Sequence, residues 1–306
     1  MPVVDFHLHC YDRPLRAPES FVAFMDRELA KAYGSFAKFL EQYGSAESYL
    51  RVLDDAGADY GVILAELAPI TSAIASNETV EALCKGQPRL IPFASLNPYL
   101  IENPAREFER LVRDRGFRGL KLYPTYSYFY PNDPKLYPVY AKAQELGIPV
   151  KWHTGTSVFP ASRLKYGDPV YIDDVAVDFP DLVAIITHSG RPIWYETAYT
   201  LARLRPNVYM EVAGLPPKRL LAYFPDLRAR ERQGALRLRL AERAHHEGEH
   251  RHDPGLAALR SRQGADPRRQ RRPSPQAHLR APMLIDCHVH LLPRRRLAGL
   301  MKWMHG

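Results

Sequence analysis

The chain has 306 residues, of which 46% are hydrophobic, and a formal net charge of +8 at pH 7. This length fits two ordinary domains or one large α/β domain of about 250 residues. The three scattered cysteines, Cys10, Cys84 and Cys287, favour structural thiols in a reducing compartment over a disulfide framework. No apolar run approaches the ~18 residues of a membrane span and no signal segment precedes the first apolar run, so we expect a cytoplasmic protein without a membrane partner.

The positive charge is concentrated in the last part of the sequence. Residues 228–296 contain 17 Arg, no Lys and 7 acidic residues, a net charge of +10, whereas the remainder sums to −2. All 18 Tyr and 12 Phe lie at or before Phe224. A stretch that lacks these residues and any hydrophobic period cannot bury enough apolar surface to offset its ordering entropy. We therefore expect one folded domain at residues 1–227 and a poorly ordered, Arg-rich tail at residues 228–282.

Seven short apolar runs alternate with amphipathic segments up to Phe224. The amphipathic segments include ESYLRVLDDAG, NPAREFERLVRDRG and PVYAKAQELG, which all end at Gly, a helix stop signal. This βαβα order predicts a parallel sheet covered by helices. The fold class is therefore α/β, a TIM-type (β/α)8 barrel with seven recognisable βα units and the eighth lost. In chain order the apolar runs span residues 3–9, 60–67, 90–97, 117–124, 148–155, 182–190 and 207–214.

Four histidines lie in or at the ends of three predicted strands. His7 and His9 are two residues apart in the first strand, so their side chains point to the same side. His153 follows the fifth apolar stretch and His188 the sixth, and each is followed within two residues by Gly. The C-terminal ends of barrel strands meet at one mouth, where such folds carry out their chemistry. Any one of these residues fits a hydrogen-bonded strand-end histidine, but the four together favour a metal site.

The ordered series VDFHLH, GFRGLKLYP, IPVKWHTG, IITHSG and NVYMEVAG resembles the amidohydrolase superfamily over residues 1 to about 225. The resemblance is to its amidohydrolase-related branch, which contains TIM-barrel metal-dependent hydrolases and decarboxylases of small organic acids. It implies that His7, His9 and His153 bind a divalent metal ion, expected to be zinc, and that His188 is the catalytic acid or base. Such an ion lowers the pKa of its water toward ~7, and a neighbouring imidazole can take and return the proton.

Substrate contacts are expected from the fourth strand and from the loops at the mouth. Lys121 ends that strand, where relatives with two metals carry a carboxylated lysine; a contact to a substrate carboxylate and a structural ion pair are the alternatives. The aromatic loop 123–133 either lines a pocket for a flat substrate or packs down on the barrel. The expected substrate-binding residues are Lys121, Tyr123, Tyr126 and Arg191. Lower-ranked candidates are Glu66, Asn97 and Glu211.

These residues support two reactions on a small organic acid. The first is hydrolysis of an ester, lactone or amide by metal-activated water, with His188 shuttling the proton. The second is non-oxidative decarboxylation of an aromatic or unsaturated acid at the same site. We favour hydrolysis, because it requires only the metal and the base. The tail offers nucleic-acid binding as a third hypothesis, but Arg without Lys or aromatic residues argues against a nucleic-acid partner. The oligomeric state is open, with a homo-oligomer as one option.

The sequence departs from the family pattern after residue 227. The family's last ligand is an aspartate at the end of strand 8, within a run such as GSDWP, which this chain lacks. Residues 234–242 (GALRLRLAE), back-translated as GGC GCT CTT CGG CTC CGA CTG GCC GAG and read from the second base, give ALFGSDWP. The missing aspartate then lies across the codons of Arg239 and Leu240. We therefore interpret residues 228–282 as out of frame, after a shift around residues 226–233.

The same interpretation explains why a segment near the C-terminus resembles the N-terminus of the chain. The start MPVVDFHLH is echoed by MLIDCHVH from Met283 onward, without the neighbouring sequence that a true repeat would carry. We read residues 283–306 as the start of a second, amidohydrolase-like reading frame. A second metal site at His288 and His290 is the alternative. Without its strand-8 aspartate, the chain as written is expected to bind metal but to be impaired as an enzyme.

Resequencing the gene tests the frameshift directly. We expect one inserted or deleted base near codon 230, and correcting it should restore GSDWP. An uninterrupted frame across codons 226–233 would show that the Arg-rich tail is genuine.

Overall fold

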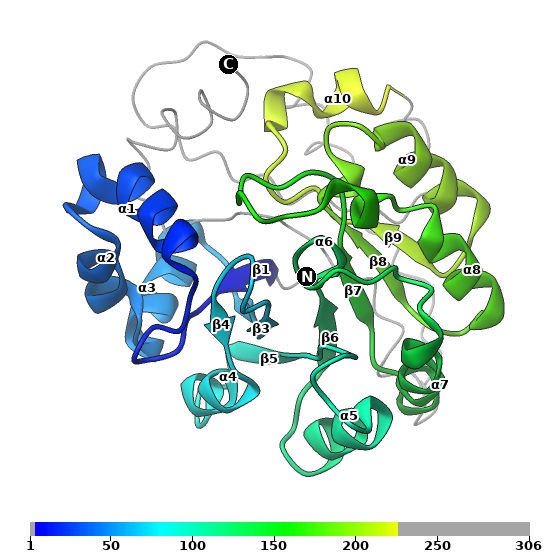
Figure 1. Cartoon of the computed structure of the whole chain (residues 1–306), viewed down its shortest axis with the longest axis horizontal. Helices are drawn as coiled ribbons and strands as arrows, with labels where there is room; N and C mark the ends of the chain where they lie inside the picture. Colours follow the sequence, from blue (N-terminus) through cyan, green and yellow to red (C-terminus); the bar gives the residue numbers. More distant parts are fainter. Residues whose placement is uncertain (1–3, 226–306) are drawn as a thin grey trace, which may run out of the picture.

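The computed structural model describes residues 4–225. Each predicted apolar run contributes one strand to a single parallel sheet, in the order β1, β2, β5, β6, β7, β8, β9. The sheet curls around a central axis with its helices outside, which confirms the predicted barrel class (Figure 1). The strands are β1 (Val4–His9), β2 (Tyr60–Leu64), β5 (Leu90–Ser95), β6 (Gly119–Leu122), β7 (Val150–His153), β8 (Ala184–Thr187) and β9 (Val208–Met210).

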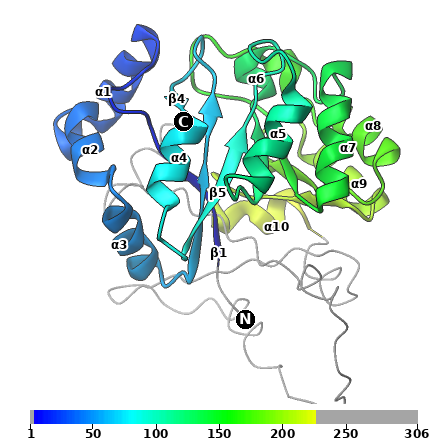
Figure 2. The ribbon, with the colours of Figure 1, turned by 90° about the horizontal axis from the view of Figure 1, so that it is seen from below.

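Helices connect successive strands, and α4, α5, α7 and α8 follow one another along the outer side of the sheet (Figure 2). The α-helices are α1 (Glu19–Tyr33), α2 (Phe36–Tyr43), α3 (Ala46–Ala56), α4 (Asn77–Cys84), α5 (Pro104–Arg113), α6 (Pro124–Ser127), α7 (Tyr137–Leu146), α8 (Tyr171–Asp178), α9 (Tyr195–Leu204) and α10 (Leu220–Tyr223). Short 3-10 turns span Pro134–Leu136, Leu164–Gly167, His188–Gly190 and Pro217–Arg219.

The three helices predicted from amphipathic segments are confirmed as α3, α5 and α7. Gly57 and Gly147 directly follow α3 and α7 with φ of 65° and 67°, in the left-handed region that glycine adopts without steric cost. Helix α5 ends at Arg113, before Gly116, which has φ of 76°. The glycine stop signals therefore placed the helix ends to within a few residues.

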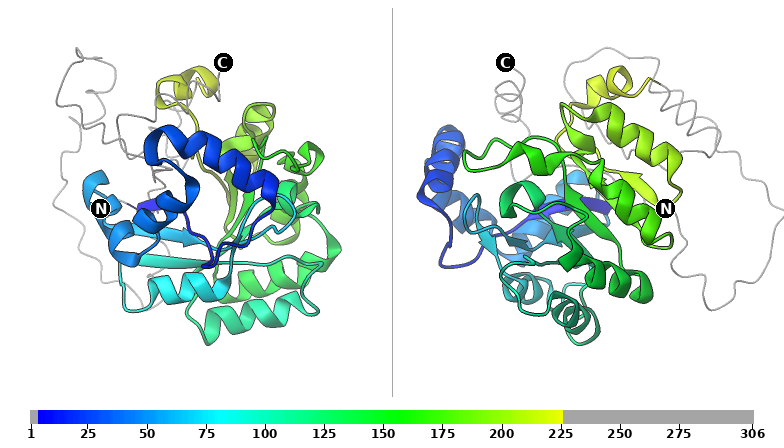
Figure 3. Two further views of the ribbon diagram at one scale, coloured as in Figure 1. Left: turned by 60° about the vertical axis from the view of Figure 1, so that its left-hand side comes forward. Right: turned by 45° about the vertical axis from the view of Figure 1, so that its right-hand side comes forward.

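The long segment between β1 and β2 contains more structure than the sequence predicted. Helices α1 and α2 form a pair on one side of the molecule (Figure 3). Their apolar faces meet in a cluster that includes Phe21, Phe36 and Phe39. After β2, the short strands β3 (Glu66–Leu67) and β4 (Ile74–Ala75) form a small antiparallel sheet of their own, which the apolar run 60–67 did not reveal.

The sheet is buried on both faces, as expected of parallel strands covered by helices. Ile63 faces the large cluster between sheet and helices, while Val62 and Leu64 belong to a smaller apolar cluster with Phe93 and Ile185. The smaller cluster therefore joins side chains of β1, β2, β5 and β8.

The barrel is open within the described residues, because β1 pairs only with β2 and β9 only with β8. The predicted tail (228–282), the predicted second frame (283–306) and the residues Cys287, His288 and His290 lie outside the described residues. Cys10 and Cys84 are free thiols, and burial raises the pKa of Cys84 to about 12, in keeping with a structural role. No helix between residues 4 and 225 is long and apolar enough to cross a membrane.

Gly119 in β6 is required by close packing. A Cβ atom at this position would lie 2.2 Å from the Phe93 ring of the adjacent strand. We expect Gly119→Ala to lower the free energy of unfolding by ~1–3 kcal/mol through overpacking, as measured by urea denaturation. Adding Phe93→Leu should recover part of that loss, since leucine lacks the clashing ring atoms. Equal stability of Gly119→Ala and the parent chain would contradict this account.

Candidate metal and substrate site at the strand ends

The structure brings the four predicted histidines together. The ring centroid of His7 lies 4.9 Å from those of both His9 and His188, and the rings of His153 and His188 are 4.8 Å apart. His7, His153 and His188 are buried, whereas 26% of the His9 side chain is exposed. The cluster therefore lies at the carboxyl ends of β1, β7 and β8, and it reaches solvent through His9.

An irregularity in β1 aims His7 at this cluster. Asp5 pairs with Gly61 and Leu8 with Ile63, so two residues of β1, Phe6 and His7, stand opposite one residue of β2. The backbone N–H of His7 donates to Asp5 Oδ1 at 3.1 Å. Such bulges redirect side chains and occur often beside functional sites. Period-two alternation predicts His7 and His9 on the same side of the strand, and their ring centroids are 4.9 Å apart in the structure.

Each histidine uses one ring nitrogen for a contact that fixes its orientation. His7 Nδ1 lies 2.8 Å from Glu211 Oε1, and His9 Nδ1 lies 3.2 Å from Glu66 Oε2. An ionised carboxylate only accepts hydrogen bonds, so the contact with Glu211 assigns the proton of His7 to Nδ1, and the neighbouring Glu66 favours the same tautomer for His9. Glu66 is itself held by Ser72, whose hydroxyl donates to Oε1. Two lower-ranked sequence candidates, Glu66 and Glu211, thus contact histidines directly.

The other two histidines are oriented by the backbone. His188 Nδ1 donates to the carbonyl oxygen of Ala213 at 2.7 Å, and His153 hydrogen-bonds to the backbone of Thr156. A carbonyl oxygen has no proton to give, so His188 Nδ1 is also the protonated nitrogen. All four rings are therefore held through one nitrogen, which is the arrangement that prepares a histidine to bind a metal through the other.

The remaining nitrogens are those that a cation would need. His7 Nε2 and His9 Nε2 face each other at 3.0 Å, and with the tautomers assigned from Glu211 and Glu66 neither nitrogen carries a proton. Two opposed lone pairs repel, and a positive ion that both contact would remove the repulsion. His153 Nε2 is buried without a hydrogen-bond partner among the described residues. These features fit a bound cation, because a buried nitrogen without a partner is costly.

The cluster as placed is not a finished metal site. Among residues 4–225, no group of three or more His, Cys, Asp or Glu side chains is arranged to hold a metal ion. The assignment of His7, His9 and His153 as three ligands of one ion therefore stays a prediction.

Burial and nearby cations keep His7, His153 and His188 neutral. Burial, followed by the charge of Lys151, lowers the pKa of His7 well below its ordinary value of 6.5. Burial also lowers the pKa of His153 and His188, reinforced most strongly by Lys121 and by Arg191 respectively. Neutral imidazoles retain the lone pair that a metal ion or a proton requires.

Three cations surround the cluster, and two of them have few partners. Lys121 is fully buried, and its Nζ has no hydrogen-bond partner in the described part of the chain. The Arg191 side chain makes one hydrogen bond within the described residues, a 3.3 Å contact from Nη1 to Ala213 O. Lys151 Nζ, in contrast, donates to Glu211 Oε1 at 2.8 Å. Burial and the charge of Lys151 lower the pKa of Lys121, an effect that a bound anion would oppose.

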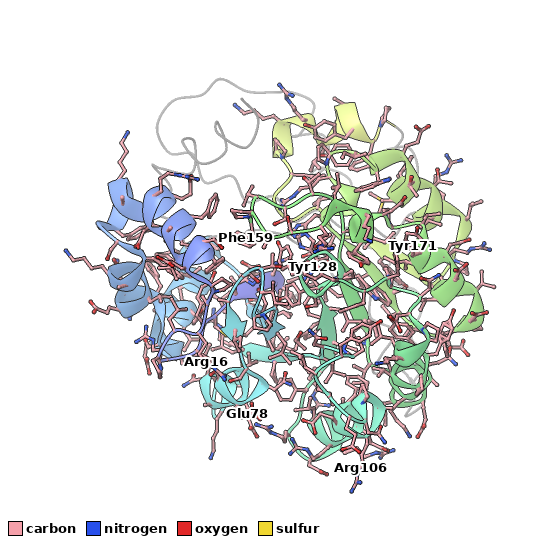
Figure 4. The ribbon with its side chains drawn as sticks, viewed as in Figure 1. Arg16, Glu78, Arg106, Tyr128, Phe159 and Tyr171 are labelled. Atoms are coloured by element: carbon pink, nitrogen blue, oxygen red, sulfur yellow. The ribbon has the colours of Figure 1, made fainter. Side chains whose placement is uncertain are left out.

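The aromatic loop both packs down and lines a pocket. Tyr123 is buried under Tyr126, with ring centroids 5.7 Å apart, and its hydroxyl donates to Ala65 O. The ring centroids of Tyr126 and His153 are 4.6 Å apart. Tyr128, from the same loop, lies near the centre of Figure 4. A pocket of about 290 Å³ is lined by Pro69, Ile70, Asn97, Tyr99, Leu100, Tyr126, Ser127 and Tyr128. Tyr126 is thus the residue that lies between this pocket and the histidines.

Aromatic contacts also connect this loop to the α1–α2 pair. Phe159 packs against Phe21 of α1 at 4.8 Å and against Tyr126 at 5.5 Å, and it lies with Tyr128 near the centre of Figure 4. The inserted helices therefore help to position the aromatic side of the site.

The turn that carries His188 has an unusual backbone. His188 and Ser189 have φ of 63° and 50°, in a region that residues other than glycine rarely adopt. Thr154 holds this turn, because its hydroxyl donates to Thr187 O at 2.6 Å and accepts from the N–H of Gly190 at 3.0 Å. Ser189 adds a hydrogen bond from its hydroxyl to Glu211 O at 2.8 Å. Backbone of this kind persists only where surrounding contacts over-determine it.

Lys151 and Thr154 contact the site but were absent from the sequence candidates. Lys151 precedes His153 by two residues in β7, so period-two alternation placed it on the same side of the strand. The alternation pattern of β7 therefore points to Lys151 from the sequence alone. Thr154 follows the strand, and only the folded turn shows its contact with Gly190.

The hydrogen bonds of Thr154 give a testable prediction. Thr154→Val keeps the shape but leaves Thr187 O and Gly190 N–H without this partner, so we expect the free energy of unfolding to fall by ~1–3 kcal/mol. The matched control is Thr125→Val, because Thr125 Oγ1 is buried without a hydrogen-bond partner among the described residues. That variant should be neutral or stabilised in urea denaturation. Equal losses for both variants would contradict the assigned role of Thr154.

Similar solved structures share this fold. An uncharacterised TIM-barrel protein from Bordetella bronchiseptica is 27% identical, with a TM-score of 0.53 over 70% of this chain and 75% of that one. A probable 2-pyrone-4,6-dicarboxylic acid hydrolase from Acinetobacter baumannii, solved with citric acid bound, is 16% identical with a TM-score of 0.51 over 78% and 81%. A 2,6-dihydroxybenzoate decarboxylase from Rhizobium is 15% identical with a TM-score of 0.52 over 74% and 84%.

Family membership follows from a longer match. No curated protein matches the sequence. The family model described as amidohydrolase matches residues 4–246, and it therefore includes every described strand and all four clustered histidines. On this match, the chain belongs to the amidohydrolase family.

Proposed function

We propose that this chain is a metal-dependent hydrolase that acts on an ester, lactone or amide of a small organic acid. The observation that carries the proposal is the histidine cluster, in which His7 Nε2 and His9 Nε2 face each other at 3.0 Å while carboxylates hold both Nδ1 atoms. His7, His9 and His153 would hold a divalent ion, for which zinc is our candidate because it accepts imidazole nitrogen. When bound, such an ion would polarise a carbonyl oxygen and activate water near neutral pH.

His188 is the proposed acid and base. Its Nδ1 is committed to Ala213 O, so Nε2 is the nitrogen that takes a proton during attack and returns it to the leaving group. The left-handed backbone at His188 and Ser189, together with the Thr154 hydrogen bonds, keeps this ring 4.9 Å from His7 and 4.8 Å from His153. A fixed ring avoids reorganisation when the proton moves.

The cations indicate a substrate with carboxylate groups. Among residues 4–225, Lys121 Nζ lacks a hydrogen-bond partner and the Arg191 guanidinium donates one hydrogen bond, to Ala213 O. A buried cation needs an anion to offset desolvation, and a substrate carboxylate supplies one. Tyr126, whose ring adjoins His153, would flank the organic part of the substrate, while the buried Tyr123 supports Tyr126 from below.

Decarboxylation of an aromatic acid at the same site is the second candidate. The observation that favours it is the aromatic wall formed by Tyr123, Tyr126 and Phe159, which suits a planar ring. The fold is found both in a probable hydrolase and in a decarboxylase, so the fold does not separate the two reactions. We favour hydrolysis, because it needs only an activated water and one proton shuttle.

The decisive experiment compares the chain as written with a frame-restored version that carries GSDWP. Both are stripped with a chelator, reloaded with Zn²⁺, and assayed on lactones of dicarboxylic acids and on hydroxybenzoic acids. We expect lactone consumption without release of CO2, abolished by the chelator and restored by Zn²⁺. The chain as written should bind Zn²⁺ but turn over more slowly, by ~10–100-fold or more, because it lacks the strand-8 carboxylate. Equal turnover of both versions would contradict our assignment of the site.

Variants of the cations complete the same experiment. In the frame-restored version, Lys121→Met and Arg191→Met should raise KM for carboxylate substrates by about tenfold or more, equivalent to ~1.4 kcal/mol or more of binding. Lys142→Met is the matched control, since Lys142 lies on the surface and pairs with Glu145. Release of CO2 from hydroxybenzoic acids would favour the decarboxylase.

A further inference from the structure

A buried ion pair lies directly behind His7. Lys151 and Glu211 are both fully buried, and Lys151 Nζ donates to Glu211 Oε1 at 2.8 Å. The same oxygen accepts from His7 Nδ1 at 2.8 Å. Glu211 Oε1 thus receives two hydrogen bonds, one from the lysine and one from the histidine, while Oε2 has no partner among the described residues.

Lys151 has a second contact that also leads to His7. Its Nζ donates to the carbonyl oxygen of Phe6, the residue before His7 in the bulge of β1. Lys151 therefore touches both supports of His7: the carboxylate that accepts from its ring and the peptide from which it projects. Lys121, the other fully buried lysine of this part of the barrel, has neither contact.

Packing of the interior alone does not explain why an ion pair occupies this position. Apolar residues such as Val62, Leu64 and Ile185 fill the neighbouring interior, and a buried ion pair is often no more stabilising than an apolar replacement of similar volume. A charged pair at this point needs another explanation, and its contacts with His7 supply one.

We propose that Lys151 is a positioning residue that fixes the tautomer and orientation of His7. By holding Glu211 Oε1 and Phe6 O, it keeps the acceptor of His7 Nδ1–H in place, and the Nε2 lone pair is then presented toward His9. The part of this proposal that concerns metal affinity rests on the proposed function, whereas the tautomer of His7 does not depend on it.

The test is ¹⁵N NMR of histidine-labelled, metal-free full-length chain, with the His7 signals assigned from a His7→Gln variant. The parent chain should show His7 protonated at Nδ1. Lys151→Met should lose this single tautomer and show a mixture or the Nε2–H form, because Lys151 no longer holds the Glu211 carboxylate in place as the acceptor for Nδ1–H. Lys121→Met is the matched control, since it removes a buried lysine that does not contact Glu211 Oε1, and it should leave the His7 signals unchanged.

Zn²⁺ affinity, measured by competition with a chelator, provides the second readout. We expect Lys151→Met to weaken binding by ~10–100-fold, as loss of an outer partner of a ligating histidine typically does. An unchanged His7 tautomer in folded Lys151→Met would overturn the proposal. Should that variant not fold, Lys151→Gln replaces it and is judged in the same way, and an Nε2–H tautomer of His7 in the parent chain would also refute the role. If the parent chain shows the predicted tautomer but binds no Zn²⁺, positioning stands and the metal assignment fails.

Discussion

The contact between His7 and Glu211 connects the two ends of an open sheet. His7 belongs to the first strand, Glu211 directly follows the last described one, and no strand among residues 4–225 pairs between them. Backbone hydrogen bonds therefore do not join these two strands within the described residues. The side chains of His7, Glu211 and Lys151 contact one another across the interior instead. In a buried setting these polar groups must satisfy one another, because an unpaired charge there is costly. Because these buried groups satisfy one another, the orientation of His7, on which the candidate site depends, is also fixed.

Orientation is the common feature of this site. Glu66, Glu211 and two stretches of backbone each hold one nitrogen of a histidine, which leaves the opposite nitrogen for chemistry. The rings of His7, His153 and His188 are neutral, since burial and neighbouring cations lower their pKa values. Neutral imidazole nitrogens favour a bound metal cation. The side chains of Lys121 and Arg191, which are incompletely paired, favour an anionic substrate.

Much of the fold was predictable because it rests on local regularities. Seven apolar runs separated by helix signals correspond to the seven strands, since a strand buried on both faces must be apolar along its length. The histidines at strand ends followed from the convergence of parallel strands at one edge. The α1–α2 pair and the β3–β4 sheet were not predicted, because their apolar residues contact partners distant in the sequence, as Phe21 does with Phe159.

The sequence by itself determined the order of strands, the family resemblance and the four histidines, because period, spacing and motif are properties of neighbouring residues. Only the tertiary structure decided how those histidines are held. The bulge at Phe6 and His7, the shared oxygen of Glu211 and the left-handed turn at His188 join segments up to 204 residues apart. Such contacts arise when buried polar groups find partners across the barrel, and no local pattern encodes which partner each group finds.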